Sequence, residues 1–215
     1  MAKKKTTKPD WRQAVKATML KATKKESVRR NGTKSYSFNY RWEHVTAVVT
    51  LAKKLAELTG ADADVVEAAA WLHDIRKETK QAHPQEGAKF AREFLPKTDF
   101  PKKKIKSVAQ AIEQHMGLWR EKPLKNLEAQ VLWDADKLSK MGMTAVFHFT
   151  CWQLAGSKPE TLDSLLARGK DADWMAKTVN SFHTKPARKA AKKRFKTYWK
   201  TWEKLEKELN GQDLL

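Results

Sequence analysis

The sequence predicts an all-α protein, and three observations support this fold class. Only eight glycines and seven prolines occur in 215 residues, so long stretches lack the residues that interrupt helices. In these stretches apolar side chains recur at intervals of three and four residues, as on the buried face of an amphipathic helix. No stretch shows the strict alternation of apolar and polar residues that is typical of a strand.

The N-terminal part of the chain predicts a tail followed by two helices. Residues 1–10 are basic and have no apolar period, so we expect a disordered tail. A lysine-rich amphipathic helix is expected over residues 11–29, because Asn31-Gly32 would break it. A second helix is expected from about residue 38 to Thr59-Gly60, with His44 in its first turns.

The rest of the chain also divides into helices. Asp62 or Asp64 can cap a third helix, which leads into His73-Asp74 at its C-terminal end. Pro84 suits the first turn of a fourth. From there on, helices are expected at residues 84–95, 105–117, 124–142, 143–155, 158–168, 171–180 and 185–209.

The chain length fits one domain over residues 11–215. The single cysteine, Cys151, cannot form a disulfide within the chain, and no apolar run reaches the roughly 18 residues that cross a bilayer. The N-terminal residues lack the apolar segment of an export signal. We therefore expect a cytoplasmic protein that does not associate with membranes.

The adjacent residues His73 and Asp74 are the most informative chemical signal. Neighbouring side chains on a regular helix diverge by about 100°, so this pair can share one target only where a helix ends. His44 and Asp134 lie upstream and downstream, each in an apolar, helix-like stretch. Imidazole and carboxylate groups bind a hydrolytic divalent cation and leave positions open for water and substrate. These four residues are therefore expected to converge on one metal ion.

Five short motifs follow one another along residues 38–145. They are Arg41-Trp-Glu-His44, Leu72-His-Asp-Ile-Arg-Lys77, His83-Pro-Gln-Glu-Gly-Ala88, Ala111-Ile-Glu-Gln-His115 and Asp134-Ala-Asp-Lys137. In kind and order they resemble the motifs of the HD-domain superfamily of metal-dependent phosphohydrolases. The resemblance implies an HD-domain-like helical bundle, with residues 146–215 as a C-terminal helical extension that ends in a long basic helix.

The resemblance also implies a ligand set. Its metal ligands here are His44, His73, Asp74 and Asp134, and the ion belongs to the Mn²⁺, Mg²⁺, Fe²⁺ or Co²⁺ class. One or two ions are expected, because in family members with two metals the histidines at two further motif positions complete a second site that the core aspartate bridges.

In this chain those two histidines are His83 and His115, and the bridging carboxylate is Asp74. The alternative is that His83 and His115 bind substrate phosphate or orient water from outside the coordination sphere. Many phosphodiesterases of the family carry a tandem His-His where this chain has His115-Met116. The sequence leaves the second metal open.

Four basic residues are candidates for contact with a substrate phosphate. Lys77 matches the lysine of the core motif, and Arg76 stands where the family commonly has glycine. Arg41 lies three residues before His44 on the same helix face, and Lys137 follows Asp134 by nearly one turn. Asp136 lies two residues from Asp134, on roughly the opposite side of the helix, so a structural role is expected for it.

The net charge of +19 argues against a cationic substrate. It leaves open phosphorylated small molecules, nucleic acid and solubility alone. The helix expected at residues 185–209 combines an aromatic face with many basic residues, and that face either packs on the domain or belongs to a nucleic-acid-binding surface. The candidates for nucleic-acid contact are Lys189, Lys192, Lys193, Arg194 and Lys196.

The function expected from the sequence is hydrolysis of nucleotides or related small phosphoesters by metal-activated water. The enzyme would be a phosphomonoesterase, a phosphodiesterase or a nucleotide pyrophosphohydrolase. Two alternatives remain. One is a nucleic-acid-binding HD protein that cleaves polynucleotide or is not catalytic, and the other is a phosphodiesterase of signalling nucleotides. Either a monomer or a homodimer fits the sequence.

Overall fold

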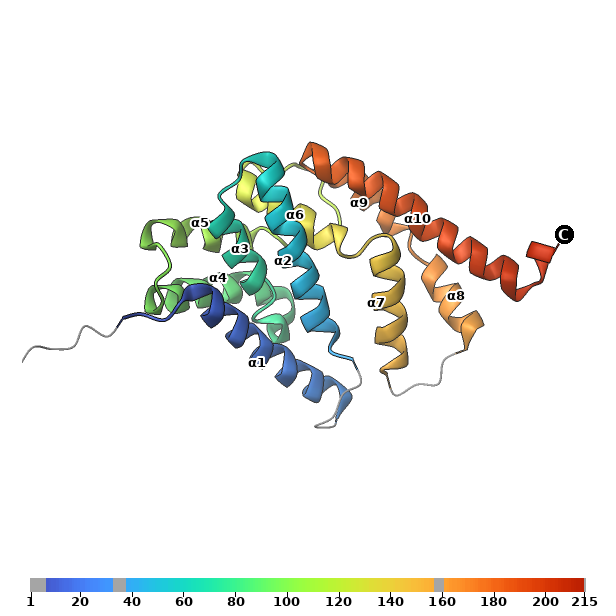
Figure 1. The fold of residues 1–215 in the computed structure, drawn as a ribbon, viewed down its shortest axis with the longest axis horizontal. Helices are drawn as coiled ribbons and strands as arrows, with labels where there is room; N and C mark the ends of the chain where they lie inside the picture. Colours follow the sequence, from blue (N-terminus) through green and yellow to red (C-terminus); the bar gives the residue numbers. More distant parts are fainter. Residues whose placement is uncertain (1–6, 33–37, 157–160, 215) are drawn as a thin grey trace, which may run out of the picture.

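The computed structural model describes residues 7–32, 38–156 and 161–214. Within these ranges every regular element is helical, with ten α-helices and four short 3-10 helices (Figure 1). The predicted all-α class is therefore confirmed. The α-helices are α1 (Trp11–Asn31), α2 (Tyr40–Thr59), α3 (Ala63–Leu72), α4 (His83–Phe94), α5 (Ile105–Glu113), α6 (Leu127–Leu138), α7 (Met143–Leu154), α8 (Leu162–Lys170), α9 (Trp174–Ser181) and α10 (Lys185–Leu209). The 3-10 helices are η1 (Lys77–Ala82), η2 (Leu95–Lys97), η3 (Lys102–Lys104) and η4 (Gln212–Leu214).

The first three α-helices begin and end at residues whose chemistry favours a helix terminus. Asp10, Asn39 and Asp62 each accept a hydrogen bond from a backbone N–H of the first turn of α1, α2 and α3. Gly32 and Gly60 follow α1 and α2 with φ of 69° and 75°, a left-handed conformation that glycine adopts without strain. The breaks predicted at these two glycines are therefore found in the structure.

Two helices in the middle of the chain are shorter than predicted. Helix α5 ends at Glu113 rather than at residue 117, and Gly117 lies in the irregular segment that follows, with φ of 100°. Helix α6 begins at Leu127, because the Asn126 side chain accepts a hydrogen bond from the backbone N–H of Ala129 and caps the helix there. The segment between α5 and α6 carries His115 and borders the candidate site.

Residues 1–6 of the predicted tail lie outside the described residues. The described end of the tail contacts the rest of the protein. The Lys8 Nζ atom donates to the Pro96 carbonyl at 2.5 Å, and the Asp99 N–H donates to the Pro9 carbonyl at 3.1 Å. Residues 8–10 therefore hold the start of α1 against the segment that follows α4.

Helix α6 lies at the centre of the fold. Every residue from Val131 to Ser139 is buried, because α2, α3, α5 and α10 all pack on this helix. A helix that is covered on all sides also buries its polar residues, and buried charges require partners. The two aspartates and the lysine of this stretch are therefore fixed by specific contacts.

The C-terminal helices α7 to α10 extend the molecule away from α1 to α5 (Figure 1). Helix α10 packs on α6, α7, α8 and α9. Its contact with α8 is close at Gly169, since a Cβ atom there would lie 2.4 Å from ring carbons of Trp202. Tyr198 and Trp202 are buried, so the aromatic face of α10 packs on the protein. None of the helices in the described ranges is both long and apolar enough to cross a membrane.

Candidate metal centre

Six buried side chains from five helices meet beside α6. They share the chemistry of metal ligands, since each carries an imidazole or a carboxylate. Helix α2 supplies one, the end of α3 two, and α4, the end of α5 and α6 one each. They are His44, His73, Asp74, His83, His115 and Asp136.

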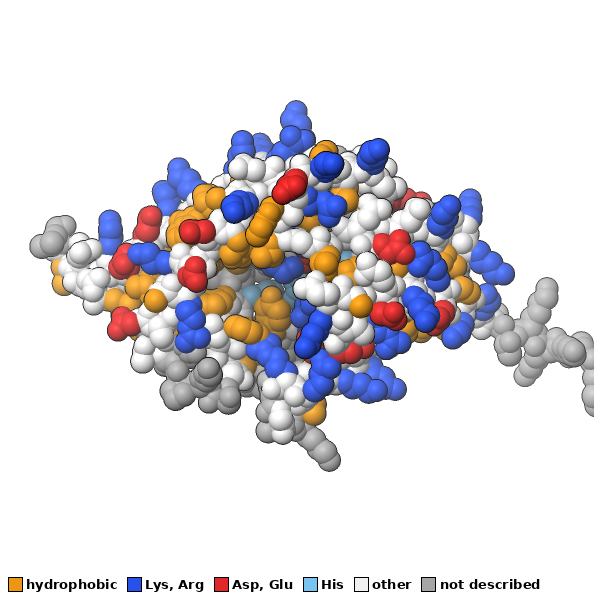
Figure 2. Space-filling model, turned by 180° about the vertical axis from the view of Figure 1, so that it is seen from behind, with side chains coloured by type: hydrophobic (Ala, Val, Ile, Leu, Met, Phe, Trp, Pro, Cys, Tyr) orange, Lys and Arg blue, Asp and Glu red, His pale blue; other side chains and the backbone are white. Residues whose placement is uncertain are grey.

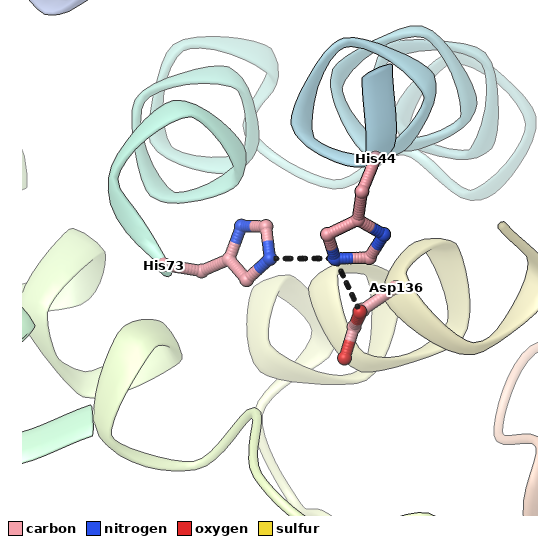
Figure 3. A group of neighbouring side chains, drawn as sticks. All are labelled: His44, His73 and Asp136. Carbon is pink, nitrogen blue, oxygen red and sulfur yellow. Dashed lines mark hydrogen bonds and ion pairs between the residues drawn. The ribbon is translucent and has the colours of Figure 1, made fainter. Parts of the chain in front are cut away.

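Three of these residues form a first triad (Figure 3). The Nε2 atoms of His44 and His73 lie 3.4 Å apart. The Oδ1 atom of Asp136 lies 3.2 Å from the Nε2 atom of His44. All the ligand atoms of this triad lie within 4.8 Å of one another. One ion could therefore contact all three side chains.

Asp74, His83 and His115 form a second triad with the same spread of ligand atoms. The Nε2 atoms of His83 and His115 lie 3.1 Å apart. The Oδ1 atom of Asp74 lies 3.4 Å from the first of these nitrogens and 3.7 Å from the second. The two histidines left open by the sequence therefore belong to one group with the core aspartate.

Asp74 connects the two triads. While its Oδ1 atom faces the second triad, its Oδ2 atom lies 3.7 Å from Nε2 of His44 and 3.6 Å from Nε2 of His73. The two carboxylate oxygens thus point to different triads, an arrangement that allows one carboxylate to contact two ions.

Backbone carbonyls fix the orientation of three of the imidazoles. The Nδ1 atom of His73 contacts the Ala70 carbonyl at 2.8 Å, and that of His115 contacts the Ile112 carbonyl at 2.6 Å. The Nδ1 atom of His83 contacts the Lys80 carbonyl in the same way. A carbonyl oxygen only accepts hydrogen bonds, so each Nδ1 atom carries the proton. Each Nε2 atom therefore presents a lone pair to the site.

The fourth imidazole, that of His44, is oriented by a hydroxyl group. The Oγ atom of Ser139 donates to the Asp136 carbonyl at 2.7 Å and lies 3.1 Å from Nδ1 of His44. With its only proton already donated, this hydroxyl accepts from Nδ1 of His44. His44 therefore also presents the lone pair of Nε2.

This pattern of protonation leaves lone pairs facing lone pairs. Nε2 of His44 faces Nε2 of His73 in the first triad, and Nε2 of His83 faces Nε2 of His115 in the second, and neither imidazole of a pair has a proton to donate to the other. The Lys77 ammonium lies 3.2 Å from Nε2 of His83. The Oδ1 atom of Asp74 is buried and makes no hydrogen bond to any described residue, although the Lys77 ammonium lies 3.1 Å away. Clustered lone pairs on buried atoms are costly unless a cation lies among them. The residues present therefore fit one or two divalent ions.

Burial and neighbouring charges hold the ligands in the protonation states that metal binding requires. Burial lowers the pKa of His44 to about 4, and the positive charge of Lys140 acts in the same direction. Burial also lowers the pKa of His73 and of His115. Metal ions bind the neutral imidazole, which is the form these histidines keep at neutral pH.

The two carboxylates are ionised for a different reason. Burial alone would raise the pKa of Asp74 and of Asp136. The Asp74 carboxyl is nevertheless held well below its usual range, chiefly by the positive charge of Arg41. Lys137 and Lys140 do the same for the pKa of the Asp136 carboxyl. Negative charge at the centre of the site is thus stabilised by basic side chains around it.

The basic residues around the site differ in how they reach it. Arg41 pairs with Asp74 and also donates to Glu26 at 3.1 Å. The Lys77 Nζ atom lies 3.1 Å from Asp74 Oδ1 and 3.2 Å from His83 Nε2. Lys137 pairs with Asp136, and burial lowers its pKa to about 8. These three predicted phosphate-binding residues therefore do lie at the site.

Arg76, the fourth predicted phosphate-binding residue, does not lie at the site. Arg76 is exposed. Its guanidinium lies 5.0 Å from the centroid of the Phe90 ring and 3.6 Å from the Glu78 carboxylate. Lys140, which the sequence did not single out, pairs with Asp136. Its position four residues after Asp136, one helical turn further on, is the signal that could have identified it.

The prediction that Asp134 joins the other three ligands is wrong. Its carboxylate accepts four hydrogen bonds from the two residues just before α10, from the backbone N–H and Nδ1 of His183 and from the N–H and Oγ1 of Thr184, at 2.7 to 3.1 Å. Asp136, which was expected to be structural, takes its place beside His44. Residues two apart on a helix point about 200° apart, so only one of these two aspartates can face the triads.

The predicted nucleic-acid-binding residues are only partly exposed. Lys189, Lys192, Lys193 and Lys196 are exposed on α10. Arg194 is half-buried and donates to the Leu138 carbonyl at 2.6 Å, so it is part of the contact between α10 and the end of α6. Figure 2 shows histidine side chains at the bottom of a surface hollow, with hydrophobic and basic side chains around it.

A family model described as "HD domain" matches residues 41–141 of this chain. Among solved structures, a predicted HD superfamily hydrolase from an uncultured Thermotogales bacterium has 21% sequence identity and a TM-score of 0.65, with 94% of each chain covered. Bacillus subtilis YpgQ in complex with ADP has 20% identity and a TM-score of 0.64, over 93% of this chain and 98% of that chain. An HD-superfamily hydrolase from Bacillus thuringiensis has 18% identity and a TM-score of 0.61, over 92% and 97%. No curated protein matches this sequence.

Proposed function

Because this chain belongs to the HD domain superfamily, we propose that its two triads bind divalent metal ions and that it hydrolyses phosphate esters or anhydrides of nucleotides. The observation that carries this proposal is the inward orientation of four imidazole lone pairs around one buried carboxylate. A donor set of neutral nitrogens and carboxylate oxygens suits ions of the Mn²⁺, Mg²⁺, Fe²⁺ or Co²⁺ class.

In this proposal the two triads have distinct ligand sets that share one residue. His44, His73, Asp74 and Asp136 would hold a first ion. Asp74, His83 and His115 would hold a second. A divalent ion in such a site lowers the pKa of its water and polarises a phosphoryl oxygen.

The basic side chains of the site would stabilise negative charge on the substrate phosphate. During cleavage of a P–O bond negative charge develops on the phosphate oxygens, and nearby cations stabilise it. The Lys77 Nζ atom lies within 3.2 Å of both Asp74 and His83, so its ammonium would lie next to a phosphate bound beside the second triad. Arg41 and Lys140 are placed in the same way beside the first triad.

Two observations favour nucleotides as the substrates. YpgQ, a structural relative, was crystallised with ADP, and the net charge of +19 favours an anionic ligand. Cleavage at a terminal phosphate, at an internal anhydride or at a diester is compatible with the site.

The test is a screen of metal-stripped protein against nucleoside mono-, di- and triphosphates and phosphodiesters, with Mn²⁺, Mg²⁺, Fe²⁺ or Co²⁺ added back. The products are identified so that release of phosphate is distinguished from release of pyrophosphate. Turnover is expected only with metal, and His73→Ala and Asp74→Ala should abolish it while the helical circular dichroism is retained. Undiminished turnover in both variants would refute the proposal.

The exposed lysines of α10 support a second candidate, the binding of nucleic acid. Four lysines form an exposed basic stretch, namely Lys189, Lys192, Lys193 and Lys196, and such a surface binds phosphates without sequence preference. Affinity for DNA or RNA would then fall steeply with salt, and exchange of these lysines for glutamine would weaken binding. If the wild-type protein binds no nucleic acid at low salt, this candidate is excluded.

A further inference from the structure

A pocket of about 560 Å³ lies beside the first triad, between α1–α2, the end of α6 and the C-terminal helices α7–α10. Its inner end is polar. Arg41, Ser139 and Lys140 line it there, and these residues pair with Asp74, orient His44 and pair with Asp136, respectively. Three residues that line the pocket thus contact candidate ligands, so the pocket adjoins the candidate metal centre.

The wall that leads outward from this end is aromatic. The ring of Tyr40 lies parallel to the imidazole of His44, with 6.0 Å between centroids and 4° between planes. His148 and Trp152 of α7 lie next, with their ring centroids 5.9 and 6.5 Å from that of Tyr40. A continuous series of flat side chains thus runs from the first triad to the surface.

The metal centre does not need this aromatic wall. In the part of the chain that the structure describes, the ring contacts of His148 and Trp152 are with Phe38, Tyr40 and Arg30 rather than with a candidate ligand, and both rings are partly exposed. Trp174 of α9 lines the pocket as well. The guanidinium of Arg30 lies over the Trp152 ring at 4.5 Å and adds positive charge near the outer end.

The pocket therefore combines an anion-binding inner end with a flat aromatic wall. Its volume lies within the range of roughly 300–1,000 Å³ that is usual for small-molecule sites. Flat aromatic side chains bind nucleobases by stacking, whichever base is present. Inorganic polyphosphate would use only the polar end, so the aromatic wall distinguishes a nucleoside phosphate from phosphate chains that lack a base.

We propose that the pocket binds the base of a nucleoside phosphate by stacking on His148 and Trp152, with its phosphates at Arg41, Lys140 and the first triad. The inference rests on the proposed function and adds to it a part of the chain outside residues 41–141. In this arrangement the C-terminal helices select the substrate, while α2, the end of α3 and α6 supply the candidate ligands of the first ion.

The test compares two ligands by isothermal titration calorimetry of the full chain in Mn²⁺ and, separately, in EDTA. One is an α,β-methylene nucleoside triphosphate, which resists cleavage between its α- and β-phosphates. The other is inorganic tripolyphosphate. The wild-type protein should bind the nucleotide analogue more tightly. Trp152→Leu should weaken binding of the analogue at least fivefold, from the usual contribution of one stacked base, and leave tripolyphosphate binding unchanged. Trp152→Phe should restore most of the loss.

The matched control is Phe147→Leu, an exposed aromatic residue on the same helix that does not line the pocket. It should change neither affinity. His148→Ala provides a second variant should Trp152→Leu lose its helical circular dichroism. Equal affinity of the wild-type protein for the two ligands, or equal losses for both ligands in folded Trp152→Leu, would overturn the inference.

Failure of the inference is distinguishable from failure of the proposed function. If the analogue binds through Trp152 but no metal supports hydrolysis, the base pocket stands and the proposed activity falls. If the protein hydrolyses nucleotides and tripolyphosphate with the same KM, and Trp152→Leu changes neither KM, the activity stands and the base pocket falls.

Discussion

The exchange of roles between Asp134 and Asp136 can be tested by a pair of isosteric substitutions. Each aspartate is replaced by asparagine, which keeps the size of the side chain and removes its charge. Asp136 lies 3.2 Å from Nε2 of His44, whereas Asp134, among the described residues, hydrogen bonds only to His183 and Thr184, just before α10. One substitution should therefore affect metal binding, and the other should affect stability.

Asp136→Asn should weaken Mn²⁺ binding at least about tenfold, because even partners outside the coordination sphere contribute roughly 10–100-fold to metal affinity. The loss of the carboxylate also removes the partner of Lys137. Since burial already lowers the pKa of this lysine to about 8, it can release its proton instead of remaining charged and unpaired. The metal-free variant should therefore stay folded.

Asp134→Asn should have the opposite pattern. The asparagine oxygen can still accept from two of the four donors, but its amide group then faces the other two. Two lost hydrogen bonds to a charged acceptor correspond to about 3 kcal/mol or more of unfolding free energy. Mn²⁺ affinity per folded molecule should be close to that of the wild type.

The assays are calorimetric titration with Mn²⁺ after removal of metal, and urea unfolding in EDTA. The wild-type protein is the reference for both. If Asp134→Asn abolished Mn²⁺ binding while the protein remained folded, and Asp136→Asn had no effect on it, the geometry described above would be refuted.

Three further outcomes are expected from particular contacts. Ser139→Ala removes the acceptor of the His44 Nδ1 proton and should lower Mn²⁺ affinity by roughly 10–100-fold. Unchanged affinity in a calorimetric titration would show that this hydroxyl does not orient His44. Gly169→Ala places a methyl group against Trp202 and should lower the unfolding free energy by about 1–3 kcal/mol or more. Mn²⁺ binding should not weaken. An unchanged midpoint of urea unfolding would contradict the close packing of α8 on α10. Finally, the pKa of His44 is about 4 in the folded protein against 6.5 for a free histidine, so the unfolded chain binds the extra proton as pH falls between these values. The metal-free protein should lose on the order of 3 kcal/mol of stability from this residue between pH 7 and pH 4, and urea unfolding that showed no loss would count against a neutral, buried His44.

Most residues of the candidate metal centre could be predicted from the sequence because the signals for them are local. His73 and Asp74 are adjacent, and only a helix end allows both to turn to one target; α3 does end at Leu72. Gly32 and Gly60 end α1 and α2 because glycine adopts the left-handed backbone conformation without strain. His83 and His115 could be placed by their motifs, although the sequence left their role open.

The assignment of Asp136 could not be made in the same way. The choice between Asp134 and Asp136 depends on which side of α6 faces α2, and a helix that is buried all round has no polar side to indicate this. Asp134 is held by Thr184, fifty residues further along the chain. No local pattern reports such a contact.

The pocket beside the first triad could not be predicted from the sequence either. It exists because α7 brings His148 and Trp152 against Tyr40 at the start of α2. Helical periodicity predicts that α7 to α10 form, but not against which part of the protein they pack. The basic face of α10 was visible in the sequence, whereas the use of Arg194 in packing was not.

Anomalous diffraction from crystals grown with Mn²⁺ would show directly whether the two triads hold divalent ions and share Asp74. Peaks are expected at coordination distance, roughly 2.0–2.5 Å, from Nε2 of His44 and His73 and, where a second ion binds, from Nε2 of His83 and His115, with Asp74 adjoining each peak. Mn²⁺ peaks only at other positions would show that the two triads are not metal sites.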